Sequence, residues 1–114
     1  MWIVLNDAFL SVVQYRDQPD VLLVRARVAG DIERAVPGAE VWVDPEADYR
    51  FRAEVPREVV AQALAEAVGK IGYGNFKNSV ADPVRHDVYA AVWADLTVLQ
   101  PEGGRYHPPA RTAP

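Results

Sequence analysis

The stretch that decides the fold class is FLSVVQY-RDQPD-VLLVRARV, residues 9–28. Its two arms, Phe9–Tyr15 and Val21–Val28, are rich in β-branched and aromatic residues, which favour strands. Between them, residues 16–20 are polar apart from one proline, as in a turn. The pattern predicts an antiparallel β-hairpin closed by a five-residue loop.

The segments on either side of the hairpin extend the fold. Met1–Leu5 is a further extended segment, joined through Asn6-Asp7 either as a separate strand or across a bulge. After the hairpin, Gly30 ends the second strand, and we expect Asp31 to cap a short helix over Ile32–Val36.

Two more strands are predicted at Ala39–Val43 and Tyr49–Val55, around the acidic turn 44–48. Both alternate apolar and polar residues, which indicates a sheet with one face in water. The acids of the turn alternate as at the start of a calcium loop. However, Tyr49 and Val55 stand where that loop needs Gly and Glu, so no metal site is expected.

From Pro56 onward the apolar residues recur at helical spacing. One amphipathic helix follows Pro56 and breaks at Gly72–Asn75, and a short turn or helical piece is expected at Phe76–Val80. Asp82-Pro83 then starts the last helix, Val84–Gln100. The side chains expected on the core face of that helix are Val88, Val92, Leu96 and Leu99.

The predicted architecture is α+β. It is a four-stranded antiparallel sheet in ββαββαα order, with two C-terminal helices packed on one face. Residues 1–100 form a single domain, and the Pro- and Gly-rich segment 101–114 is a flexible tail.

Composition limits the classes of function. The chain has 114 residues, no cysteine and a formal net charge of −4. The lack of cysteine excludes disulfides and thiolate chemistry and favours a reducing, cytoplasmic location. The N-terminal apolar run is too short for a signal peptide or a membrane span, so no membrane association is expected. No cofactor is expected, and the acidic balance disfavours broad, charge-driven nucleic-acid binding.

Four arginines form the first candidate binding group. Arg25 and Arg27 lie two apart in one predicted strand, and Arg50 and Arg52 do so in another, so each pair projects from one face. If the strands are adjacent, four guanidinium groups share the open face and can grip phosphates or carboxylates. The alternative is an ordinary solvated face laced with acids.

The loop Gly72–Ser79 is the second candidate. Tyr73, Asn75, Phe76 and Lys77 can stack a base or hold an anion there, although phosphate-loop spacing is missing. The alternative is a plain connection between two helices.

One histidine and three tryptophans are further candidates. His86 lies beside Arg85 and an acid, so it can serve as a general base. The alternative is an exposed histidine near a helix start. No catalytic residue is therefore assigned. Trp2, Trp42 and Trp93 are expected to pack in the core or against the sheet, and an exposed one would indicate an interface.

Four segments resemble a loose set of short proteins from high-GC bacteria, their phages and mobile elements. They are VRARVAGDIE (24–33), DYRFRAEV (48–55), IGYGNFKNSV (71–80) and the step from Tyr89 to Val92-Trp93. The resemblance implies no activity. It implies a context in which small accessory proteins bind a host or element protein.

Three functions remain open. The leading hypothesis is a small, non-enzymatic interaction or regulatory protein that binds a protein partner through the open sheet face. The alternative is a module for RNA or single strands that uses the arginines and the loop. The third is an enzyme built around His86, Arg85 and an acid. A homodimer is compatible with each of them.

Overall fold

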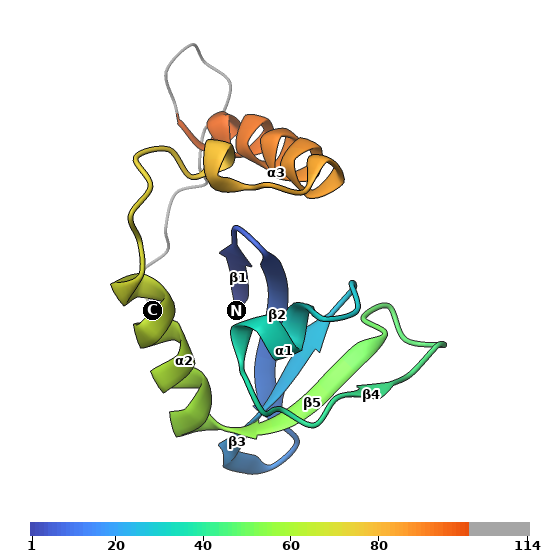
Figure 1. The fold of residues 1–114 in the computed structure, drawn as a ribbon. Coiled ribbons are helices and arrows are strands. Elements are labelled where there is room, and N and C mark those ends of the chain that lie inside the picture. The colour runs from blue at the N-terminus through green and yellow to red at the C-terminus, as the bar shows by residue number, and fades with distance from the viewer. Residues whose placement is uncertain (101–114) are drawn as a thin grey trace, which may run out of the picture. The chain divides into compact units, whose positions relative to one another are not determined.

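Figure 1 shows the computed structural model, which describes residues 1–100. The chain divides into two compact units, Met1–Gly74 and Asn75–Pro114, and each is described by itself. Because this division does not test whether the units unfold together, the predicted single domain stays a prediction. The predicted flexible tail, 101–114, lies outside the described residues.

The first unit is built on an antiparallel sheet of five strands in the order β1-β2-β3-β5-β4 (Figure 1). The bounds are β1 Trp2–Leu5, β2 Ala8–Tyr15, β3 Gln18–Ala26, β4 Trp42–Val43 and β5 Phe51–Pro56. The α+β class with an antiparallel sheet is confirmed, but the strand number was wrong. The additional strand is β1, which pairs with β2 across Asn6-Asp7 because its backbone N–H and C=O groups need partners on a neighbouring strand.

The β2–β3 hairpin has a tighter turn than predicted. Tyr15 pairs with Gln18, so only Arg16 and Asp17 form the loop, rather than five residues. Arg16 has a φ of 52°, in the left-handed region that tight hairpin turns use. The register shifts between Gln14 and Tyr15. Residues 19–21 of β3 therefore have no partner on β2 and form a bulge, which includes Pro19.

The helix α1, Asp31–Ala35, begins differently from the prediction. Gly30, with a φ of 92°, is the N-cap, and Asp31 is the first helical residue. Asp31 is 1% exposed, and its carboxylate accepts the backbone N–H of Phe9 at 3.0 Å and pairs with Arg34. The Phe9 N–H belongs to β2 and lies beyond the end of β3. The Asp31 carboxylate therefore accepts the hydrogen bond that a longer β3 would otherwise accept.

One face of the sheet is covered by α1 and by α2, Arg57–Gly69 (Figure 1). The core between them consists of Ile3, Leu10, Val12, Val24, Ala26, Ile32, Val36, Ala53, Val55 and Val60. Because successive strand residues point to opposite faces, the intervening side chains lie on the other face of the sheet. This second face carries the candidate site.

The second unit contains η1 Lys77–Ser79, α3 Pro83–Leu96 and η2 Thr97–Leu99. The predicted start of α3 is confirmed: the Asp82 side chain accepts the backbone N–H of Arg85 at 2.8 Å, and Pro83 follows the cap. No helix within residues 1–100 combines the length and apolarity needed to cross a lipid bilayer.

The buried side of α3 differs from the prediction. Tyr89 is buried and stacks on Phe76, with ring centroids 5.9 Å apart. The side chains predicted to face a core are exposed; they are Val88, Val92, Leu96 and Leu99. The reason is that the segment before α3, which contains Phe76 and η1, packs against the face of the helix that carries Tyr89. The predicted packing of α3 on the sheet stays a prediction.

Candidate functional site

One row of side chains crosses all five strands on the sheet face opposite α1 and α2, here called the open face. In the strand register, Trp2 is opposite Ser11, Ser11 opposite Arg25, Arg25 opposite Arg52, and Arg52 opposite Trp42. Residues directly opposite each other in an antiparallel ladder project to the same face, so these five side chains form a line, the transverse row. The two strands, β3 and β5, are adjacent as the shared-face hypothesis required, but only Arg25 and Arg52 lie within them; Arg27 follows β3 and Arg50 precedes β5.

Exposed tryptophans occupy both ends of the transverse row. Trp2 is 73% exposed and Trp42 is 40% exposed, because each lies on an edge strand. The Trp2 ring also meets Phe9 edge-to-face, with centroids 5.9 Å apart. Adjacent strands are ~4.8 Å apart, so the two ends of the row are about 19 Å apart. Neither tryptophan is part of the buried core; both lie on the sheet, and their exposure is the feature that would indicate an interface.

The centre of the row is held by Tyr49, which is buried in the turn two residues before β5. The guanidinium carbons of Arg25 and Arg27 lie 4.9 Å and 4.3 Å from the centroid of its ring. Arg52 Nη1 donates to the Tyr49 carbonyl at 3.2 Å. Three of the four predicted arginines are therefore organised around one aromatic residue that the sequence did not single out as part of a site.

The remaining hydrogen bonds of these arginines go to uncharged oxygens. Arg25 Nη2 donates to Ser11 Oγ at 2.7 Å, and Arg27 Nη1 donates to the Asp48 carbonyl at 3.0 Å. Within residues 1–100, none of the four predicted guanidinium groups, that of Arg50 included, forms an ion pair with a carboxylate. The open face therefore offers positive charge that no contacting acid neutralises.

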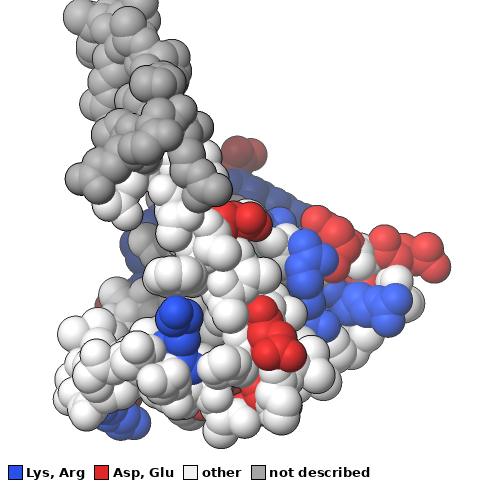
Figure 2. Space-filling model, turned by 90° about the horizontal axis from the view of Figure 1, so that it is seen from above, with Lys and Arg blue, Asp and Glu red and all other residues white. Residues whose placement is uncertain are grey.

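Acidic residues lie close to this face, but within residues 1–100 their carboxylates form no ion pair with the four arginines. Asp44 Oδ1 accepts the Glu46 N–H at 3.1 Å and Asp48 Oδ1 accepts the Tyr49 N–H at 2.8 Å, so the two aspartates stabilise the β4–β5 turn. In Figure 2, basic and acidic side chains lie next to one another at the right-hand end of the molecule. The surface is therefore mixed in charge, with no extended block of one sign in that view.

The second predicted group belongs to a different part of the chain. Tyr73 belongs to the first unit, which ends at Gly74, whereas Asn75, Phe76 and Lys77 begin the second. Phe76 stacks on Tyr89, Lys77 Nζ lies 3.8 Å from the ring centroid of Trp93, and Asn75 Oδ1 accepts the Asn78 N–H at 3.1 Å. Phe76 and Lys77 thus pack against α3, whereas Asn75 bonds within its own segment.

His86 and Arg85 lie in the first turns of α3. Arg85 Nη1 donates to the Tyr89 hydroxyl at 3.1 Å, and His86 Nδ1 is 3.7 Å from Asp87 Oδ1. Asp82, four residues before His86, caps the helix by accepting the Arg85 N–H instead of orienting the histidine. The arrangement fits a helix start, and the general-base hypothesis gains no geometric support from it.

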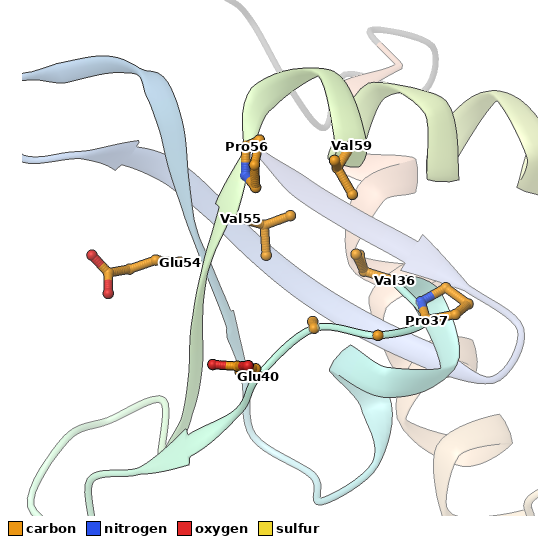
Figure 3. Close-up of a pocket in the computed structure, with 9 residues that line it drawn as sticks. Val36, Pro37, Glu40, Glu54, Val55, Pro56 and Val59 are labelled. Atoms are coloured by element: carbon orange, nitrogen blue, oxygen red, sulfur yellow. The ribbon is translucent and has the colours of Figure 1, made fainter.

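A shallow hollow of about 330 Å³ lies between the segment after α1 and the β5–α2 junction (Figure 3). Val36, Val55 and Val59 form its apolar side, while the carboxylates of Glu40 and Glu54 point away from them. The sequence carried no signal for this hollow, and it contains no cluster of polar groups that converge on a ligand.

Comparison of the chain with protein-family models, with curated proteins and with solved structures found no match in any of the three.

Proposed function

We propose that this chain is a non-enzymatic interaction protein that binds an acidic segment of a partner protein across the open face. The supporting observation is the transverse row, in which two exposed tryptophans flank two arginines that pair with no carboxylate of residues 1–100. Tryptophan and arginine are the side chains that most often dominate binding energy at interfaces, and unneutralised guanidinium groups favour an anionic partner.

The size of the row suits a short peptide segment. An extended chain rises ~3.3 Å per residue, so a row about 19 Å long accommodates about six residues. Apolar residues of the segment would cover Trp2 and Trp42, and its carboxylates would meet Arg25 and Arg52. The proposed setting is the cytoplasm of a high-GC bacterium, with a host or mobile-element protein as partner, in keeping with the absence of cysteine.

A fluorescein-labelled peptide of alternating Glu and Leu, long enough to span the row, tests this proposal by fluorescence anisotropy. We expect it to bind the wild-type chain and to bind Arg52→Ala and Trp42→Ala more weakly. Lys70→Ala is the matched control, because Lys70 is an exposed cation at the end of α2. Failure of the peptide to bind, or equal affinity for all these variants, would contradict the proposal.

Binding of single-stranded nucleic acid is the second candidate. It is favoured by the stacking of two guanidinium groups on Tyr49 beside exposed indole rings, since bases stack on such groups. The net charge of −4 disfavours it. A labelled oligothymidine decides between the two: binding that weakens steeply as salt rises, without binding of the acidic peptide, would make nucleic acid the ligand.

A further inference from the structure

The sheet has two edge strands, and they differ in how well they are protected from pairing with another chain. β4 is two residues long and lies between Glu40 and Asp44, and short edges with nearby charges resist further pairing. β1 contains no charged residue, and its Trp2 and Val4 side chains are 73% and 41% exposed. An uncharged, exposed edge is a template for another strand.

The hydrogen bonds of Met1 show which backbone groups of β1 face outward. The Met1 ammonium donates to the Val12 carbonyl at 2.7 Å, and the Val12 N–H donates to the Met1 carbonyl at 2.8 Å. In an antiparallel ladder, bonded pairs alternate with non-bonded pairs. It follows that Ile3 bonds to β2, whereas the N–H and C=O groups of Trp2 and Val4 point away from the sheet.

We propose that β1 pairs with the same strand of a second copy of this chain, antiparallel and centred on Ile3. A twofold axis at Ile3 places Trp2 opposite Val4 of the second copy, so every outward N–H meets an outward C=O. The edge is thus complementary to itself, and it carries no side-chain charge that would repel its copy. Trp–Val neighbours across the new strand pair are of the aromatic and β-branched kind that stabilises sheets.

Pairing in this way joins two five-stranded sheets into one and makes their open faces continuous. Each copy contributes its own transverse row, with the two Trp2 residues near the shared centre. The pairing itself involves only β1 and does not depend on what the transverse row binds.

Sedimentation velocity of the full chain tests the proposal from about 10 µM to about 1 mM, the range in which small interfaces associate. We expect a monomer at the low end and a dimer at the high end. Val4→Pro removes an outward N–H but no bond to β2, and proline is tolerated at such edge positions, so this variant should fold and stay monomeric. Val4→Thr keeps the N–H and the β-branched shape and should still dimerise.

Amide exchange followed by NMR locates the interface independently. The Trp2 and Val4 amides should exchange at least tenfold more slowly at high than at low concentration, whereas the Ile3 amide should be protected at both. A monomer throughout the range overturns the proposal, as does a dimer that Val4→Pro leaves intact. Protection of Trp2 and Val4 only when the acidic peptide is added also overturns it, because the edge would then take a partner's strand.

Discussion

Arg25 and Arg52 face each other across β3 and β5, and both are held through Tyr49 instead of through a carboxylate. Like charges directly opposite each other normally destabilise a sheet. Here one guanidinium lies near the ring of Tyr49 and the other donates to its backbone carbonyl, and neither pairs with a carboxylate in the described part of the chain. This arrangement favours binding over stability.

Replacing Tyr49 separates the role of its ring from that of its hydroxyl. Tyr49→Phe keeps the ring, and the hydroxyl has no hydrogen-bond partner in the part of the chain that the structure describes, so the free energy of unfolding should change by less than about 0.5 kcal/mol. Tyr49→Leu removes two cation–π contacts and should cost ~1–2 kcal/mol. Urea unfolding of both variants measures the difference. Equal stability would show that the guanidinium contacts contribute little.

Truncation of Arg52 should weaken binding of the acidic peptide. A side chain at the centre of an interface contributes ~1–2 kcal/mol, so Arg52→Ala should lower the affinity ~5- to 30-fold. The loss should shrink as salt rises, because screening weakens the interaction that the variant lacks. Anisotropy titrations at low and physiological salt check both points. A loss of the same size in Lys70→Ala would indicate a general effect of net charge.

The buried carboxylate of Asp31 should be important for stability. Asp31→Ala leaves the Phe9 N–H without its acceptor and Arg34 without its ion-pair partner, which should lower the free energy of unfolding by ~2–4 kcal/mol. Asp31→Asn retains an acceptor oxygen and should cost less. Glu33→Ala, at an exposed acid on the same helix, is the control and should change stability by less than about 0.5 kcal/mol. Urea unfolding measures all three.

Two glycines allow backbone strain to be separated from crowding. Gly30 has a φ of 92°, and an added Cβ would lie 2.6 Å from Arg34 Nη1. Gly38 has a φ of 87° with nothing within 4 Å. Gly38→Ala should therefore cost only the left-handed penalty, ~1 kcal/mol, whereas Gly30→Ala also displaces Arg34 and should cost ~2–3 kcal/mol. Thermal or urea unfolding that ranks the two variants in the opposite order would contradict this account.

Several parts of the fold could be predicted because their signals act within a few residues. Alternation of side chains revealed the strands, and the Asp82-Pro83 pair located the start of α3. The two-residue spacing of the arginines drew attention to both strands, although only Arg25 and Arg52 lie within them. Other local interpretations were wrong because a distant partner was involved. Asp31 bonds to a strand 22 residues earlier in the chain instead of capping its helix, and the Arg16 turn is shortened by strand register.

The candidate site was predicted in part for the same reason. The arginines came from local spacing, but the tryptophans at the two ends of the row and Tyr49 at its centre lie on segments far apart in the sequence. By itself, the amino-acid sequence determined which segments form strands and helices and which strand faces carry charge, since these depend on neighbours along the chain. Only the tertiary structure decided which strands are adjacent, which residues form the transverse row and which strands form the edges of the sheet. These depend on the register between segments distant in sequence, and register is a property of the packed sheet as a whole.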